Sequence, residues 1–201
     1  MLKLAQLWSQ ARGCFRASQR VDLYAEYVSW MTHELGIVNV YPLQVGRDRL
    51  IGPQDRAANY TDQLLKFGKR PLHSLWGASW DLHHIAMLDM IQDGDIIDIA
   101  GRDVMLATAD RALVRLRDRI HDLAVRTDTP RGLLPFKAAR SDVDRRLSDH
   151  VGRIESIHEE MNAAVWARAS AGAEMPTVDH VLAEIAQLEP LVEAAMLKRA
   201  Q

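Results

Sequence analysis

The sequence predicts an α/β fold rich in helix, in which a parallel sheet is followed by a C-terminal helical hairpin. Along residues 20–126, helical periodicity and β-branched runs alternate in the order helix, strand, helix, helix, strand, helix, an order typical of parallel sheets covered by helices. Two long helical patterns then follow a segment containing Pro130, Gly132 and Pro135. The composition, 48% hydrophobic and 26% charged, is that of a globular protein.

The first third of the chain is predicted to contain three helices and one short strand. Residues 1–19 form an amphipathic pattern, and residues 21–35 place apolar side chains near a helical period before a stop at Gly36. The β-branched run over residues 37–43 predicts a strand. Residues 56–68 predict the third helix, closed by a glycine.

The rest of the chain is predicted to continue the alternation and then change to helices alone. A helix over 81–94, a buried strand over 104–109 and a helix over 109–126 complete the α/β part. Two helices over 141–169 and 177–200, joined by a short turn, indicate an αα-hairpin. We therefore divide the chain into an α/β domain, residues 1–126, and a helical extension, residues 127–201.

Composition limits the class of protein. No stretch approaches the roughly 18–20 apolar residues of a membrane span, so we expect no membrane partner. Cys14 is the only cysteine, which excludes an intrachain disulfide and favours the cytoplasm. The net charge of -2 argues against a protein that coats nucleic acid, but residues 102–146 carry eleven basic and seven acidic side chains. This excess is typical of a solvated helix face or of a local phosphate-binding patch.

Two aspartates stand at the starts of predicted helices. Asp110 follows the predicted strand over 104–109, and Asp81 opens the helix over 81–94. Because the carboxyl ends of parallel strands meet at one edge of a sheet, both carboxylates are expected near that edge. Facing carboxylates repel each other and attract a divalent cation, and Mg²⁺ or Mn²⁺ prefers oxygen ligands. The pattern indicates a metal site that activates water.

The segments DLHHIA and VMLATADRAL resemble the third and fourth acidic motifs of the PIN-domain nucleases. In that family an Asp opens a helix, an Ala follows five residues later, and a later strand ends in a Thr and an Asp followed by an Arg. The chain supplies these residues as Asp81, Ala86, Thr108, Asp110 and Arg111. The resemblance covers about residues 20–125. The strand that opens such domains and ends in an Asp has no counterpart here.

The resemblance implies an N-terminally shortened or degenerate PIN-like domain that cleaves RNA with Mg²⁺ or Mn²⁺. The acids that it implies for catalysis and metal binding are Asp81, Asp110 and Glu26, with Glu34 as the alternative to Glu26. The residues that it implies for substrate binding are Thr108, Arg111 and Arg115.

The alternative interpretation involves no metal. Asp81 and Asp110 are then helix caps, and the adjacent His83 and His84 point about 100 degrees apart on a helix, too far for one zinc ion. The chain would be a catalytically inactive helical protein-interaction module. Its C-terminal helices would form a homodimer or bind another protein through an apolar stripe at helical spacing, made of Val181, Ile185, Leu188, Leu191 and Met196.

Overall fold

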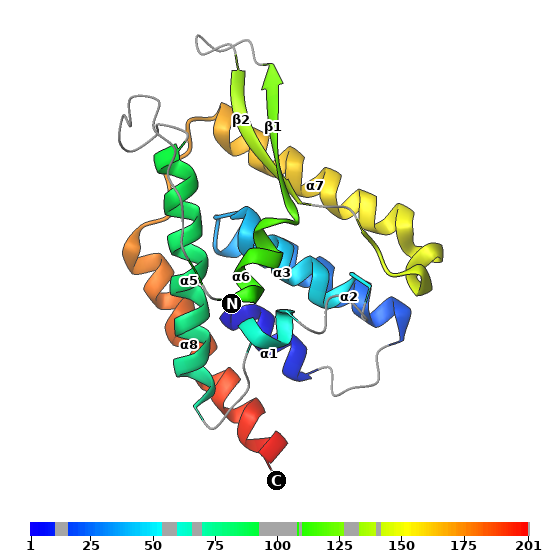
Figure 1. Ribbon diagram of the computed structural model, residues 1–201, viewed down its shortest axis with the longest axis vertical. Coiled ribbons are helices and arrows are strands. Elements are labelled where there is room, and N and C mark those ends of the chain that lie inside the picture. Colours follow the sequence, from blue (N-terminus) through cyan, green and yellow to red (C-terminus); the bar gives the residue numbers. More distant parts are fainter. Residues whose placement is uncertain are drawn as a thin grey trace.

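A computed structural model shows a predominantly helical molecule with one small β-hairpin. The residues that it describes are 1–10, 16–53, 60–65, 70–92, 108, 110–126, 133–139 and 142–200. Figure 1 shows α5 and α8 side by side along one side of the molecule, while α7 runs diagonally through the upper half, below the tip of the β-hairpin. The elements are α1 (Leu2–Gln10), α2 (Ala17–Ser29), the π-helical turn η1 (Trp30–Glu34), α3 (Val40–Leu50), α5 (Pro71–Gln92), α6 (Arg111–Arg117), β1 (Ile120–Arg126), β2 (Leu133–Ala139), the 3-10 turn η2 (Arg145–His150), α7 (Val151–Ser170) and α8 (Val178–Ala200).

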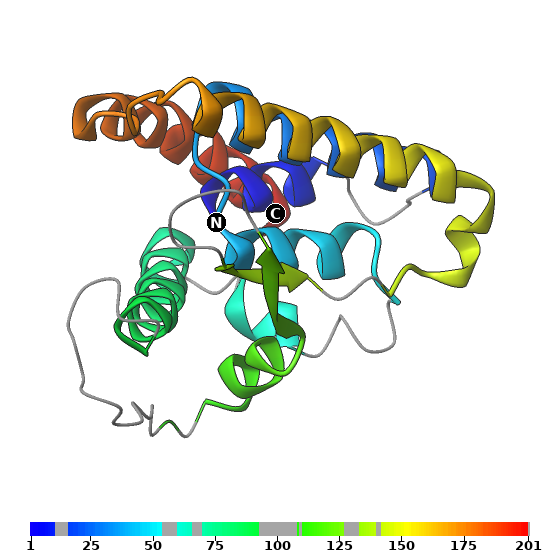
Figure 2. The same cartoon turned by 90° about the horizontal axis from the view of Figure 1, so that it is seen from above.

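Helix α3 occupies the centre of the fold. It contacts α2, α5, α6 and both strands of the hairpin (Figure 2). Nine of its eleven residues are buried. Since neighbours cover it on all sides, α3 lacks the polar outer face of an ordinary amphipathic helix.

The prediction of a strand over residues 37–43 is wrong, because α3 begins inside that segment. The side chain of Asn39 accepts a hydrogen bond from the backbone N–H of Tyr41 at 3.0 Å, which caps the new helix. Pro42 falls in the first turn, where a backbone N–H has no partner within the helix and its loss costs nothing. The proline that suggested a strand end therefore lies at a helix start.

The predicted stop at Gly36 is confirmed. The π-helical turn that extends α2 ends at Glu34, and Gly36 adopts a φ of 72°. A side chain there would be strained and would also approach Pro176 and Arg168. The glycine thus allows α7 and the α7–α8 connection to pass close to the end of η1.

The predicted parallel sheet is contradicted. The strands among the described residues are β1 and β2, and they pair antiparallel, from Ile120 opposite Ala139 to Arg126 opposite Leu133. The helix expected over 109–126 ends at Arg117, because the rest of that segment satisfies its backbone groups by pairing with β2. The strand expected over 104–109 lies outside the described residues, except Thr108, which belongs to no helix or strand.

The two C-terminal helices are present, but they do not pack along each other as the predicted hairpin. Helix α7 contacts α2 and both η turns, whereas α8 lies on α1 and α5. Ile154 of α7 and Leu188 and Val192 of α8 join the same hydrophobic core as the N-terminal helices. The helical extension is therefore wrapped around the rest of the molecule, because each helix buries its apolar residues against a different neighbour.

Among the helices in the described ranges, none is long and apolar enough to cross a membrane.

Candidate functional site

The three acids predicted to hold a metal lie in different settings. Asp110 is the N-cap of α6, and its carboxylate accepts a hydrogen bond from the backbone N–H of Ala112 at 2.8 Å. Asp81 lies inside α5, half-buried, because that helix begins ten residues earlier at Pro71. Glu26 is exposed on α2 and forms an ion pair with Lys3 at 2.8 Å. Asp110 is thus a cap, as the alternative interpretation expected, whereas Asp81 is not.

These acids do not form a metal-binding group. Within the described part of the chain, no set of three or more His, Cys, Asp or Glu side chains is arranged to hold an ion. The predicted substrate-binding residues lie beside Asp110. Thr108 accepts a hydrogen bond from the backbone N–H of Asp110 at 3.0 Å, and Arg111 and Arg115 are exposed on α6.

Among the described residues, a cluster of charged and polar side chains surrounds Asp48 of α3, which is 1% exposed. Its carboxylate accepts hydrogen bonds from the Tyr60 hydroxyl and from Nε and Nη2 of Arg119, the last at 2.6 Å. Burial and the charge of Asp48 raise the pKa of Tyr60. Burial acts to lower the pKa of Arg119, but its bonds to Asp48 outweigh this effect, so the pKa is raised. Tyr60 and Arg119 therefore stay protonated and saturate the carboxylate with donors.

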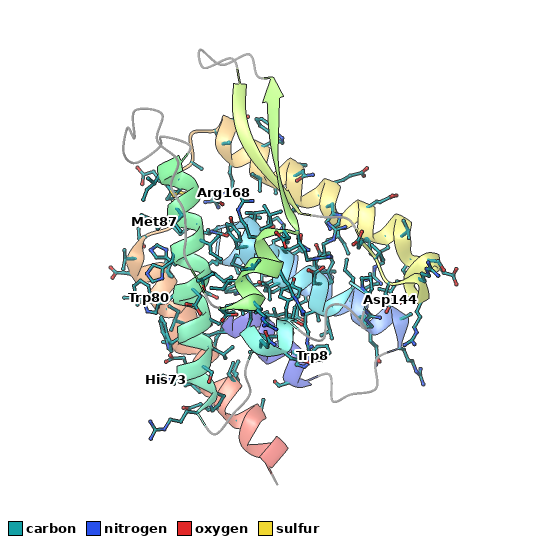
Figure 3. All side chains as sticks on the ribbon, in the orientation of Figure 1. Trp8, His73, Trp80, Met87, Asp144 and Arg168 are labelled. Carbon is teal, nitrogen blue, oxygen red and sulfur yellow. The ribbon has the colours of Figure 1, made fainter. Side chains whose placement is uncertain are left out.

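Two further buried arginines join α3 to its surroundings. Arg20 of α2 donates to Asp144 Oδ2 at 2.7 Å and to the backbone carbonyls of Leu50 and Gly52 (Figure 3 labels Asp144). Arg49 forms an ion pair with Asp62 at 2.6 Å, and its guanidinium lies 3.7 Å from the ring centroid of Trp8. These contacts tie distant segments to α3 and are typical of a structural polar core.

Helix α8 is held by two glutamates that turn toward the body of the molecule. Glu184 accepts a hydrogen bond from Trp30 Nε1 of η1 at 2.9 Å. Five residues later, Glu189 accepts one from Trp76 Nε1 of α5 at 3.0 Å. Two anchors on different neighbours fix the rotation of α8 about its own axis.

With this rotation the outer face of α8 is mostly apolar. Between residues 182 and 194 the exposed positions are Leu182, Ala183, Ala186, Gln187, Pro190, Leu191, Glu193 and Ala194. Glu193 is the one charged side chain among these eight. Val178 and Leu182, which are 73% and 54% exposed, begin a row at four-residue spacing that continues through Ala186 and Pro190. We call this row of four residues the α8 ridge.

A pocket of about 190 Å³ lies behind α8, on the opposite side from the α8 ridge. Its wall is largely apolar and combines α1, η1, α5 and α8. The stripe proposed from the sequence as a dimer surface faces this space: Val181, Ile185 and Leu188 line the pocket. These three residues of the stripe therefore face the interior of the chain. Leu191 is 49% exposed and belongs to the outer face of α8, and the side chain of Met196 lies outside the described residues.

Comparison with known proteins gave no relative: no family model, no curated protein and no solved structure matches the chain. The resemblance to PIN-domain nucleases is therefore wrong. No model of that family matches, and no parallel sheet is present among the described residues to carry the motifs. Of the two motif acids, one caps α6 and the other lies inside a long helix, so the matching letters reflect common helix signals.

The sequence analysis predicted neither the α8 ridge nor the burial of the polar side chains of α3. The sequence does contain a signal for the ridge, since apolar residues recur there at intervals of four: Val178, Leu182, Ala186 and Pro190. The stripe that begins at Val181 has the stronger helical periodicity, and the sequence analysis therefore interpreted that stripe as the surface. The charged residues at 47–49 of α3 predict an exposed segment, because charged side chains are rarely fully buried.

Proposed function

We propose that this protein is a helical protein-interaction module that assembles through the α8 ridge. The observation that carries the proposal is the inversion of α8: its acidic residues Glu184 and Glu189 bind neighbouring indoles, while alkyl side chains occupy its solvent face. A helix that is only a surface element places its charges outward. An exposed apolar row that is rimmed by polar residues is typical of an interface.

The partner that fits this ridge best is a second copy of the chain. A row of residues at four-residue spacing forms a ridge that packs into the corresponding groove of another helix, and two such rows can interdigitate. The small side chain of Ala186, between Leu182 and Pro190, permits a close approach of the two backbones. Between residues 182 and 194 the face carries a single charge, at Glu193, so this part presents no pattern that requires an oppositely charged partner. The same patch on both subunits gives a two-fold symmetric interface.

Sedimentation equilibrium tests the proposal by measuring the mass in solution. We expect the native chain to be a dimer at about 100 μM, since even an interface with a dissociation constant of about 10 μM is mostly occupied there. Replacing Leu182 and Ala186 together with Glu places four like charges in the symmetric contact and should give a monomer. The matched control is Val114→Glu on α6, since Val114 is 48% exposed and distant in sequence from α8.

A native chain that stays monomeric at this concentration would contradict assembly with a second copy. Dissociation by Val114→Glu to the same extent as by the α8 double variant would show that the ridge is not the interface. Circular dichroism of each variant establishes that loss of mass is not loss of folding.

Binding of Mg²⁺ or Mn²⁺ by Asp81, Asp110 and Glu26 stays a prediction. The test is the thermal midpoint with and without millimolar Mn²⁺, for the native chain and for an Asp81→Asn, Asp110→Asn double variant. A metal that binds only the folded state raises the midpoint of the native chain alone. A native midpoint that does not change when Mn²⁺ is added would rule the site out.

A further inference from the structure

The pocket behind α8 has the composition of a small-molecule site. Its volume is about 190 Å³, and it is lined mainly by apolar side chains together with two indoles, Trp30 of η1 and Trp76 of α5. Its other polar side chains are Ser79 of α5 and Glu184 of α8. A concave, mostly apolar space with a few polar groups is the usual form of a site for a small ligand.

The side-chain donors of this wall are already used within the chain. Trp30 Nε1 donates to Glu184 Oε2 at 2.9 Å, and Trp76 Nε1 donates to Glu189 at 3.0 Å. The Ser79 hydroxyl donates to a backbone carbonyl one turn earlier in α5, at 2.8 Å. The side-chain groups that can still bind a ligand are therefore acceptors, namely the second oxygen of the Glu184 carboxylate and the oxygen of Ser79.

The charge of Glu184 decides which ligands fit. Among the described residues, the partner of its carboxylate is the neutral Trp30 indole, and no cation is paired with it. Met1 also lines the pocket, but burial lowers the pKa of its amino group to about 6, so this group gives Glu184 no positive charge at about pH 8. A ligand that covers the carboxylate without a donor removes its water and leaves the charge unmatched. The wall therefore favours a ligand with an apolar body and a protonated nitrogen.

The volume limits the size of the apolar body. An apolar cavity of about 150 Å³ holds a single benzene molecule, so 190 Å³ has room for one aromatic ring and a short alkyl chain. We propose that the pocket binds a small arylalkylamine in its protonated form. The ring lies among apolar side chains such as Leu75 and Leu188, and the ammonium group donates to the second oxygen of Glu184. Because the pocket faces away from the α8 ridge, this proposal does not depend on assembly of the protein.

Isothermal titration calorimetry with 2-phenylethylamine at about pH 8 tests the proposal. The amine is protonated there, since an alkylamine such as a lysine side chain has a pKa of about 10.4. For a ligand of this size we expect a dissociation constant on the order of 100 μM. The neutral isostere 2-phenylethanol should bind about tenfold more weakly, and phenylacetate should not bind, because neither supplies a positive charge to Glu184.

Two variants separate the charge from the cavity. Glu184→Gln keeps an acceptor for Trp30 Nε1 but removes the charge, so binding of the amine should weaken about tenfold while binding of the alcohol stays unchanged. Ser79→Leu fills the pocket and keeps both glutamate anchors of α8, so it should abolish binding of both ligands. Glu193→Gln is the matched control, because it makes the same change on the exposed face of the same helix. It should bind the amine as the native chain does.

Equal affinities for the amine and the alcohol, or binding of phenylacetate as tight as that of the amine, would overturn the assignment of a cationic ligand. Full affinity for the amine in Glu184→Gln or in Ser79→Leu would overturn the site. A native chain that binds no amine up to about 5 mM would overturn the proposal as a whole. Circular dichroism shows whether each variant is folded, and the result for Ser79→Leu stands even if Glu184→Gln loosens α8.

Discussion

Helices α3 and α8 use charged residues in opposite ways. In α3 the charged side chains lie inside, among them Arg47, Asp48 and Arg49, and the helix has almost no solvent face. In α8 two glutamates are turned toward neighbouring indoles, and the solvent face is mostly alkyl. Neither helix follows the simple division into an apolar inside and a charged outside.

The comparison separates two roles. Asp48 and Arg49 of α3 are bound by partners from other parts of the sequence, such as Arg119, which lies 71 positions beyond Asp48. Such a network makes the position of α3 specific. The glutamates of α8 have one indole partner each, and the helix contributes two residues, Leu188 and Val192, to the core. Helix α3 organises the fold, whereas α8 presents a surface.

The largest expected effect comes from Asp48→Asn. The substitution leaves Arg119 without its carboxylate in a buried setting, so we expect it to reduce the free energy of unfolding by about 3 kcal/mol. The measurement is urea denaturation of the native chain and the variant. Glu193→Gln on the exposed face of α8 is the control, with an expected change below about 0.5 kcal/mol. Similar losses for both variants would mean that the two helices do not differ in this way.

Substitutions at two glycines compare the tightly packed helix α3 with an exposed helix surface. A Cβ atom on Gly46 of α3 would overlap the ring of Tyr27, whereas one on Gly152 of α7 would meet nothing within 4 Å. We expect Gly46→Ala to cost about 2 kcal/mol through overpacking. Gly152→Ala should instead stabilise the protein by roughly 0.5 kcal/mol, because alanine favours the helix. Thermal melts of both variants check the signs, and a neutral Gly46→Ala would show that α3 is loosely packed.

The same contrast explains what could be predicted from the sequence. Helices α7 and α8 and the stop at Gly36 followed from apolar spacing and from glycine, which act locally. The identity of α3 did not follow, because its buried positions include Gln44 and Arg47, whose burial depends on partners far along the chain. The end of α6 was missed for a related reason: β1 exists because residues 133–139 pair with it.

The candidate sites were less predictable than the helices. For Asp110 the sequence left two interpretations open, a metal ligand and a helix cap, and the structure shows that it caps α6. Asp81 was predicted to open a helix, but it lies inside one, because α5 begins ten residues earlier at Pro71. The contact between Tyr24 of α2 and His158 of α7 joins residues 134 positions apart, and no spacing rule within one segment contains that information.

The pH dependence of stability provides a third comparison, through His158. Its folded pKa of about 4 lies below the ordinary value of 6.5, so the unfolded chain binds a proton that the folded chain does not. Stability from this group is complete above about pH 6.5 and is lost as the pH falls toward 4. Burial is the main cause of the lowered pKa, and the positive charge of Arg47 on α3 acts in the same direction. Tyr24 on α2 contacts the ring directly.

His158→Gln should therefore lose less stability on acidification than the native chain. Allowing for the partial exposure of the ring, we expect the difference to be about 1 kcal/mol between pH 7 and pH 4.5. Urea denaturation at the two pH values gives the comparison. His180→Gln on α8 is the control, because His180 is exposed. Parallel losses in the native chain and in His158→Gln would contradict the lowered pKa.

The smallest expected effect concerns the attachment of α8. Trp76 is 41% exposed, and its indole N–H donates to Glu189. Trp76→Phe removes this bond, and a solvent-exposed hydrogen bond contributes only about 0.5–1 kcal/mol. Trp80→Phe, one turn later on α5, is the matched control, because Trp80 is 56% exposed and contacts His83 and His84 through its ring. Urea denaturation should give Trp76→Phe a free energy of unfolding below that of Trp80→Phe by this amount.

If Trp76→Phe also weakens dimerisation in sedimentation equilibrium while the control does not, the indole contact sets the rotation of α8 that exposes the ridge. Unchanged assembly would mean that Trp30 and Glu184 alone are enough to hold it.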